Sequence, residues 1–515
     1  MIKQRLNRIS LEAGQKHVFD ELTEAPVTVL QIGEGNFLRG FFDWMIHESR
    51  KQGLFQGSVA VVQPRPSGKP KIEELAEQDG LYTLVTRGLE NGSPVERKQV
   101  ITVFSSAFDP YSDWEQFFSL AKQPQLRFVV SNTTEAGLVY RQEAYSEGKP
   151  VQSFPGKLTQ LLYERYIAFN GDPAKGLICL PCELLERNGD TLRECVLRYC
   201  EDWRLPQAFR SWVVEHNRFL NSLVDRIVTG YPDAKQAEQW FAEWGYEDPL
   251  LTTAEPYHLW AIEGESELEQ QLPLASAGLN VLWVDDLKPF QQRKVRILNG
   301  AHTFMALLGM LKGLSEVRAA MEHDELGVLI IRTIESEIIP SLPYDQTELQ
   351  TYAKQVCERF LNPFIQHRLS DITMNSLSKF QTRLLPSLKF YLQHNEAFIA
   401  QKDQVGSDGE SVSLPQGLAA ALAALLRHYR IVKVDESGYW GQSFTGEQYL
   451  LRDDRELLIK LADIWALFHQ AERSLQETVA VLLSLEELWQ SNLHAAYPQL
   501  AEQITSIIEQ WEREL

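Results

Sequence analysis

The amino-acid sequence predicts an α/β protein in which a domain with a parallel sheet is followed by an all-α domain. In the first half, short apolar runs alternate with segments of helical periodicity, and this alternation is typical of parallel strands joined by crossover helices. After about residue 290 the apolar runs of strand type fade, and long amphipathic helical patterns take their place. These two observations predict the fold class and the order of the domains.

The elements of the first domain are predicted from apolar runs of strand length. The expected strands cover residues 26–32, 58–63, 97–105, 127–132 and 176–181. A segment of helical periodicity, residues 37–53, connects the first two strands as a crossover helix would. The order of strand, helix and strand predicts parallel pairing at the start of the chain.

The second domain is predicted from helical periodicity. The expected helices cover residues 294–313, 347–369, 415–430, 455–487 and 498–514, and a polar loop covers 404–417. The helix at 415–430 is too short to span a membrane and is expected to be buried. The linker is expected within 270–290, so the domains are predicted as 1–285 and 286–515.

The composition is that of a globular protein and disfavours several classes of partner. The chain has 515 residues, of which 44% are hydrophobic and 23% charged, so it can bury a large core. Its net charge of −20 repels phosphate backbones and anionic lipids, which disfavours nucleic-acid and membrane partners. No stretch resembles a signal peptide or a membrane span, so we expect a cytoplasmic protein. No obligate protein partner is predicted.

Four of the five cysteines form a pattern that could bind zinc. Cys179 and Cys182 are followed, after twelve residues, by Cys195 and Cys200, and two such pairs can close a tetrahedral site. The first pair lies in an apolar run of strand type, and the second lies in a helical pattern whose spacing of five aligns two ligands poorly. Buried structural thiols are the better interpretation, and no metal is expected.

A turn that contains two glycines follows the first predicted strand. Gly33 and Gly35 come directly after the apolar run that ends at Ile32, and Asn36 and Phe37 open the next helical pattern. Backbone N–H groups and the positive end of a helix can hold a pyrophosphate at such a turn, as in a Rossmann-like dinucleotide-binding domain. Because the third glycine of the usual fingerprint is missing, an ordinary tight turn is an alternative of about equal weight.

The residues after the second predicted strand bear on the choice of dinucleotide. An Asp or Glu here would bind the ribose 2′-hydroxyl of NAD, but the chain has Gln63, Pro64 and Arg65. A basic residue can face the 2′-phosphate of NADP, so these residues alone lean slightly toward NADP. A solvated surface arginine is the more ordinary interpretation of Arg65.

Lys294, Asn299 and His302 form the pattern with the clearest chemical meaning. Asn299 and His302 are three residues apart at the start of an apolar helical stretch and share a face, and Lys294 precedes Asn299 by five residues. The reduction of a ketone needs such a set, because a lysine can deliver the proton while amide and imidazole groups hold the oxygen. The alternative is a surface lysine and a helix histidine without a catalytic role.

The pattern Lys294-x4-Asn299-x2-His302 resembles the active-site signature of the mannitol dehydrogenase family, the polyol-specific long-chain dehydrogenases. A second segment agrees, because residues 224–227, Val-Asp-Arg-Ile, are similar to another signature of that family. This segment ends in Thr229, where Pro or Ser is usual. Further similarities run along the whole chain.

The resemblance implies catalytic roles for four residues. Lys294 would be the general acid in reduction and the base in oxidation. Asn188 and Asn299 would form the oxyanion pocket, and His302 would orient the substrate.

The resemblance also suggests residues around the substrate. Lys379 matches a family lysine near the substrate and would bind a substrate carboxylate. Members that act on neutral polyols tend to have an arginine eight residues earlier, where this chain has Asp371, and Arg368 is a weaker candidate for that role. Asp225 would support the site from behind or form an ion pair with Arg226.

The cofactor and the reaction are implied by the resemblance as well. The family mostly uses NAD and needs no metal, and its site is expected in the cleft between the two domains. The branch that this chain most resembles interconverts D-altronate and D-tagaturonate in the breakdown of hexuronates. Reduction of fructuronate or oxidation of mannitol is the alternative within the family. A non-catalytic sensor that binds a dinucleotide is the alternative outside it.

Overall fold

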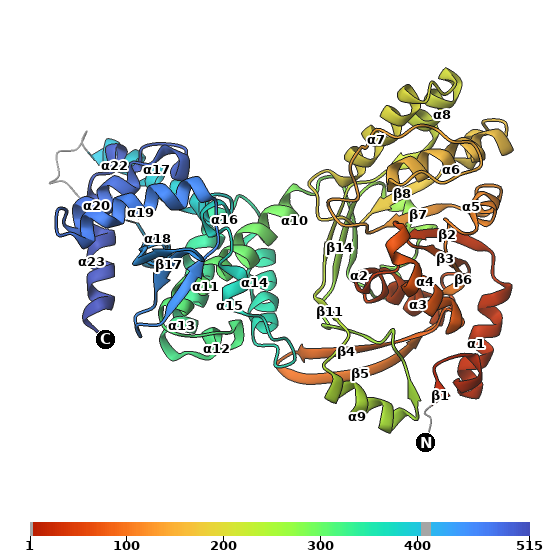
Figure 1. The fold of residues 1–515 in the computed structure, drawn as a ribbon, viewed down its shortest axis with the longest axis horizontal. Coiled ribbons are helices and arrows are strands. Elements are labelled where there is room, and N and C mark those ends of the chain that lie inside the picture. The colour runs from red at the N-terminus through yellow and green to blue at the C-terminus, as the bar shows by residue number, and fades with distance from the viewer. Residues whose placement is uncertain (1–3, 403–413, 515) are drawn as a thin grey trace. The chain divides into compact units, whose positions relative to one another are not determined.

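The computed structural model describes residues 4–402 and 414–514, and Figure 1 shows its helices and strands. The chain forms two compact units, one of Met1–Gly88 with Pro94–Lys288 and the other of Leu89–Ser93 with Pro289–Leu515. Residues 403–413, which make up most of the polar loop expected at 404–417, lie outside the described residues. Each unit buries apolar residues of its own and is described by itself.

A six-stranded sheet forms the centre of the first unit and is parallel in every pairing. Its strands are, in spatial order, β6 (Phe104–Phe108), β3 (Ser58–Val62), β2 (Val27–Ile32), β7 (Phe128–Ser131), β8 (Ile178–Pro181) and β9 (Arg218–Phe219). The chain starts in the middle at β2, extends the sheet to one side through β3 and β6, and then returns to build the other side. This order is the doubly wound one, with its switch point beside β2, so the predicted Rossmann-like sheet is confirmed.

Helices cover both faces of this sheet because its strands are apolar on both sides. On β2, Val29 belongs to one buried cluster and its neighbour Leu30 to the other. The first cluster includes residues of α3 (Phe42–Lys51) and α4 (Lys69–Glu77). The second includes residues of α5 (Trp114–Ala121), α6 (Phe154–Ala168), α7 (Asn188–Asp202) and α8 (Gln207–His216). In Figure 1 the two sets of helices lie on opposite sides of the strands.

Two smaller sheets lie mostly outside the predicted strands. One consists of β10 (Ser222–Asp225), β14 (Leu259–Glu263) and β15 (Val281–Val284), and the other of β11 (Val228–Gly230), β13 (Thr252–Ala254), β4 (Tyr82–Glu90) and β5 (Ser93–Ile101). The predicted strand at 97–105 is divided between β5 and β6. The remaining elements of the first unit are α1 (Ala13–Glu24), α2 (Asn36–Arg39), α9 (Ala234–Trp244) and the pair β1 (Gln4–Arg5) and β12 (Tyr246–Glu247).

The second unit is largely helical, which confirms the prediction for this half of the chain. After α10 (Lys288–Arg293) and a π-helix (Lys294–Asn299), its helices are α11 (Gly300–Leu311), α12 (Val317–Glu322), α13 (Asp324–Thr333), α14 (Gln346–Phe360), α15 (Leu369–Ile372), α16 (Ser376–Arg383), α17 (Leu385–Lys402), α18 (Gln416–His428), α19 (Arg455–His469), α20 (Leu475–Leu483), α21 (Glu486–Trp489), α22 (Leu493–Ala496) and α23 (Gln499–Arg513). Helix α18 packs against α11 and is buried from Gly417 to His428, as expected for this apolar segment.

The expectation of an all-α domain needs correction. A three-stranded antiparallel sheet of β16 (Lys433–Asp435), β17 (Gly438–Gln442) and β18 (Gln448–Leu451) lies within the second unit. The helix expected at 347–369 ends at Phe360, shortly before Pro363, because a residue that precedes proline disfavours helical backbone. The helix expected at 455–487 is divided into α19 and α20 by a break before Ser474, which caps α20.

The thiols of the cysteine pattern are buried in the first unit. Cys179 packs into the cluster on one face of the sheet, whereas Cys182 packs into the cluster on the other face. Burial raises the pKa of Cys200 to about 12 and also raises the pKa of Cys195. Among the described residues, no group of three or more His, Cys, Asp or Glu side chains could hold a metal ion. No helix in the described ranges is long and apolar enough to cross a membrane.

Candidate functional site

The turn after β2 lies at the switch point of the six-stranded sheet. Gly33 follows the last strand residue, Ile32, and has a φ of +128° that side-chain-bearing residues rarely adopt. A Cβ at Gly33 would lie 2.7 Å from the carbonyl oxygen of Asn132, which follows the neighbouring strand β7. The Gly33 N–H donates to the carbonyl of Val62 at the end of β3, at 2.9 Å. Glycine is therefore required here by the close approach of three strand ends.

Gly35 presents open backbone at the same place. It is exposed, precedes the short helix α2, and has no atom within 4 Å of the position that a Cβ would occupy. The buried Arg39 braces the turn, because its guanidinium donates to the carbonyl of Glu34 at 3.2 Å and to the side-chain oxygen of Asn36 at 2.5 Å. Phe37 stacks on Phe41, with ring centres 4.9 Å apart. A braced turn with open backbone fits a dinucleotide phosphate.

The end of β3 carries no carboxylate that could face a ribose. Gln63 is buried and donates to the carboxylate of Asp109, which also accepts from the N–H of Tyr111 at 2.9 Å and from the hydroxyl of Ser112 at 2.5 Å. Arg65 is exposed, as expected for a surface arginine. These residues leave the choice between NAD and NADP open.

Asn188 begins α7 and has its side-chain amide occupied by backbone groups. Its Nδ2 lies within 3.0–3.1 Å of the carbonyl oxygens of Pro181, Glu183 and Ser222, and its Oδ1 accepts from the N–H groups of Gly189 and Ser222 at 2.9 Å. An amide has two donor hydrogens and one oxygen, so these partners use its full capacity. The role of Asn188 in an oxyanion pocket stays a prediction, and it would require the amide to leave some of these partners.

Val224 and Asp225 form the end of β10, and Arg226 follows directly. Arg226 is buried and donates to the carbonyls of Glu255 at 2.8 Å and Gly40 at 2.7 Å, and its guanidinium lies 4.0 Å from the ring centre of Trp44. Burial lowers the pKa of Arg226 to about 9, and the charge of Glu255 opposes that shift. Arg226 thus fastens β10 to neighbouring loops of the first unit.

In the second unit, Lys294 and Asn299 are the first and last residues of a π-helix. In such a turn the backbone bonds close between residues five apart, so these residues lie above one another as residues four apart do in an α-helix. Asn299 also begins α11, on which His302 follows three residues later. The π-helix therefore supplies the turn that the sequence spacing requires, and it places all three residues along one face. Both Lys294 and Asn299 are half-buried.

His302 lies against other rings and among cations. Its ring centre is 4.5 Å from that of Phe360 and 4.9 Å from that of His367. Burial holds the pKa of His302 well below its usual range, and repulsion by four basic side chains adds to this effect: His367, Arg359, Arg383 and Lys379. The imidazole is therefore neutral at pH 7 and can donate or accept a hydrogen bond.

Arg383, the last residue of α16, joins that helix to the start of α11. Its Nη1 donates to the hydroxyl of Thr303 at 3.0 Å and to the carbonyl of Asn299 at 3.4 Å. Sequence reasoning missed this residue because it is 84 residues from Asn299 and belongs to no family signature quoted above. One signal was available, since Arg383 lies four residues after Lys379 and shares its helix face.

Lys379 lies near this cluster and already has partners. Its Nζ donates to the carbonyl of Ile372 at 2.8 Å. Burial and the charge of Arg383 lower the pKa of Lys379, whereas Asp453 opposes the shift. The lysine is thus partly balanced by a carboxylate of its own unit, and its contact with substrate stays a prediction.

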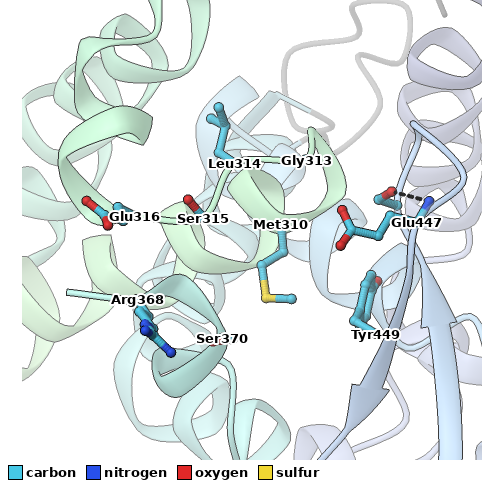
Figure 2. Close-up of a pocket in the computed structure, with 10 residues that line it drawn as sticks. Met310, Gly313, Leu314, Ser315, Glu316, Arg368, Ser370, Glu447 and Tyr449 are labelled. Atoms are coloured by element: carbon cyan, nitrogen blue, oxygen red, sulfur yellow. Dashed lines mark hydrogen bonds between the residues drawn. The ribbon is translucent and has the colours of Figure 1, made fainter. Parts of the chain in front are cut away.

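Arg368 lies elsewhere in the second unit. It is exposed and lines a pocket of about 530 Å³ together with Met310, Glu316, Glu447 and Tyr449, and Figure 2 shows Met310 between Arg368 and Tyr449. The residues that line this pocket include none of Lys294, Asn299, His302 and Lys379. The structure therefore brings Asn299, His302, Lys379 and Arg383 together, but it gives Arg368 a separate place.

Comparison with protein families matches both halves of the chain. The mannitol dehydrogenase Rossmann domain matches residues 27–276, and the mannitol dehydrogenase C-terminal domain matches residues 286–401.

Full-length relatives agree with these matches. An altronate oxidoreductase of Bacillus subtilis (strain 168) is 42% identical over 489 residues, which cover 95% of this chain and 93% of the relative. An altronate oxidoreductase of Halalkalibacterium halodurans is 41% identical over 495 residues, which cover 96% and 93%. An altronate oxidoreductase of Yersinia enterocolitica is 41% identical over 482 residues, which cover 93% of each chain.

Two solved structures share the fold. A Pseudomonas fluorescens mannitol 2-dehydrogenase in ternary complex with NAD and D-mannitol has a TM-score of 0.62 and 20% identity, with 96% of this chain and 93% of that chain covered. A substrate-free D-sorbitol dehydrogenase has a TM-score of 0.71 and 21% identity, with 95% and 93% covered.

Proposed function

Because the chain belongs to the mannitol dehydrogenase family and is thus an oxidoreductase, we propose that it interconverts D-altronate and D-tagaturonate with NAD. The observation that carries this choice of substrate is the cationic surrounding of His302 in a chain whose net charge is −20. A positive site in an acidic protein favours an anionic substrate. The names of the relatives that match almost the whole chain support the same substrate pair.

The first unit would bind the dinucleotide at the turn after β2. The residues that would hold it are Ile32, Gly33, Gly35, Asn36 and Phe37, which stand at the switch point of the sheet. Bound NADH would supply the hydride for reduction of the ketone. We propose NAD over NADP because the family that the chain resembles mostly uses NAD and because a fold relative was solved with NAD.

The second unit would supply the proton and hold the oxygen. Lys294 would donate a proton to the substrate oxygen in reduction and accept it in oxidation. The amide of Asn299, one π-turn later, would donate to the same oxygen as its negative charge develops. His302 is neutral, so it would orient a substrate hydroxyl without competing for the proton of Lys294.

The test of this proposal is the oxidation of NADH by the purified chain, with tagaturonate, fructuronate and fructose compared in parallel. We expect tagaturonate to give the highest kcat/KM and NADPH to be the poorer cofactor. A preference for fructuronate or fructose would keep the lysine chemistry but overturn the substrate. A chain that binds NADH and turns over none of the three would be a sensor rather than an enzyme.

A further inference from the structure

We propose that Arg383 receives the carboxylate of the substrate through the edge of its guanidinium formed by Nε and Nη2. The inference rests on the proposed function, because it takes the substrate to be a sugar acid. It assigns to Arg383 the role that the sequence suggested for Lys379 and, more weakly, for Arg368.

The first support is the way in which Arg383 uses its donors. Its hydrogen bonds, to the hydroxyl of Thr303 and to the carbonyl of Asn299, both come from Nη1. A guanidinium has five N–H donors, so Nε and Nη2 keep three of them. These two nitrogens form the flat fork that matches the two oxygens of a carboxylate. Since Nη1 holds the start of α11, the guanidinium is anchored beside Asn299, and its charge reaches His302, whose pKa it lowers.

The second support is the charge of Arg383. Burial lowers the pKa of the guanidinium, which nevertheless stays protonated in water at neutral pH. Within the described residues, 4–402 and 414–514, no carboxylate lies within ion-pair distance of Arg383. A largely buried charge is normally paired, because its desolvation is costly. A substrate carboxylate would provide the missing partner.

The two rival cations are each less suited to this role. Lys379 donates to the carbonyl of Ile372, and Asp453 partly balances its charge. Arg368 is exposed and lines a pocket that also contains the carboxylates of Glu316 and Glu447, which would repel an anion. The same comparison provides a matched control, because Arg368→Gln removes one positive charge from the same unit at a place that lines a different pocket.

The experiment compares D-tagaturonate with D-tagatose, which carries a hydroxymethyl group in place of the carboxylate. We expect Arg383→Gln to lower kcat/KM for tagaturonate by about 10- to 100-fold, the range for a lost hydrogen-bonded charge. The kcat/KM for tagatose should change by less than about threefold. Arg383→Lys keeps the charge but loses the fork, so its loss should be intermediate and confined to tagaturonate. The control variant Arg368→Gln should leave the ratio of kcat/KM for the two substrates nearly unchanged.

A binding measurement gives a readout that does not depend on turnover of tagatose. Calorimetric titration of D-altronate into the holoenzyme with NADH should show a Kd raised by about 10- to 100-fold in Arg383→Gln and unchanged in Arg368→Gln. Fluorescence of bound NADH verifies that each variant is folded and binds the cofactor.

The outcomes separate the two proposals. If the wild-type chain prefers tagatose to tagaturonate, the proposed function falls, and the carboxylate role of Arg383 falls with it. A second outcome is that the wild type prefers tagaturonate and that Arg383→Gln lowers kcat/KM equally for both substrates. Arg383 would then act only by holding Asn299, and this inference would be overturned while the proposed function stands. A third outcome is that Lys379→Gln loses the preference for tagaturonate over tagatose and Arg383→Gln keeps it. Lys379 would then be the residue that binds the carboxylate, and the inference would be overturned.

Discussion

At the scale of single residues, we propose that the neutral imidazole of His302 leaves proton transfer to Lys294. Its imidazole is kept neutral by burial and by neighbouring positive charge, so at pH 7 it has no extra proton to give. Lys294 lies on the same face, and its amine would donate the proton in reduction and accept it in oxidation. The division of roles between the two residues leads to a test of the lysine.

We expect Lys294→Ala to lower kcat by about 100- to 10,000-fold, which is the usual contribution of a general acid. NADH binding should persist, because the proposed nucleotide turn belongs to the first unit. The measurements are steady-state turnover and a fluorescence titration of NADH. The matched control is Lys312→Ala, because Lys312 follows the end of α11 and pairs at 3.0 Å with the exposed Glu325. Normal turnover in Lys294→Ala would remove the lysine from the mechanism.

A second prediction concerns pH and His428, which ends α18. Its ring is buried and stacks on Tyr449 with centres 4.7 Å apart, and burial lowers its pKa to about 3. In the unfolded chain a histidine titrates near pH 6.5, so between these values the unfolded state binds more protons. The free energy of unfolding should therefore fall by about 1.4 kcal/mol for each pH unit below 6.5 through this residue.

His428→Phe should remove that part of the pH dependence. Urea unfolding at pH 6.5 and pH 5 measures the difference, and the exposed His17 on α1 provides the control substitution. An unchanged slope in His428→Phe would mean that the ring is hydrated or protonated in the folded protein.

At the scale of elements, the turn between β2 and α2 can be tested by separating its two glycines. Gly33→Ala should lower both stability and NADH affinity, because its φ is +128° and the new Cβ would lie 2.7 Å from a carbonyl oxygen. Gly35→Ala has no such clash and should leave the thermal midpoint unchanged. Its methyl group should nevertheless raise the Kd of NADH, because the backbone can no longer approach the phosphates closely.

The control for these variants is Gly14→Ala on the exposed start of α1. A Cβ at Gly14 also meets no atom within 4 Å, so this change should leave NADH affinity unaltered and stabilise the helix slightly. Equal NADH affinity in Gly35→Ala and the wild type would place the dinucleotide away from the turn.

The sequence predicts the elements whose patterns are local. The strands of the central sheet are found because both of their faces are buried, which gives continuous apolar runs. The small sheet of the second unit is missed because β16, Lys433–Asp435, is short, exposed and polar. The end of α14 is also missed, although Pro363 marks it, because the helical periodicity continues past the proline.

Some features of the candidate site can likewise be predicted from the sequence, whereas others cannot. The face shared by Asn299 and His302 follows from their spacing, but the π-helix that brings Lys294 onto it is a backbone feature that periodicity does not reveal. The bond between Arg383 and the carbonyl of Asn299 joins segments 84 residues apart, and tertiary contacts of this kind leave no pattern in a single sequence. The occupied amide of Asn188 could not be foreseen for the same reason.

At the scale of the whole molecule, the two compact units suggest two folding domains. We propose that the boundary along the chain lies close to the one expected between residues 1–285 and 286–515. Units of this size with their own buried residues often unfold as separate cooperative transitions. Calorimetry of the full chain should therefore show two transitions. NADH at about 100 times its Kd should stabilise the domain that binds it by about 2.7 kcal/mol and move one transition upward.

A variant identifies which transition belongs to which unit. His428→Phe lies in the second unit and should alter the pH dependence of the transition that NADH does not move. A single transition, or one that responds to both NADH and His428→Phe, would show that the two units unfold as one cooperative body.

The π-helix has a consequence for insertions and deletions. Residues five apart in a π-helical turn lie above one another, as residues four apart do in an α-helix. The π-helix therefore contains one more residue between Lys294 and Asn299 than an α-helical turn would, and it still keeps the two on one face. Removal of one residue between them would let the segment close as an α-helix and keep the pair on one face. Addition of a residue would rotate Lys294 about 100° around the helix axis. The site is therefore expected to tolerate a shorter spacing between its two signature residues better than a longer one.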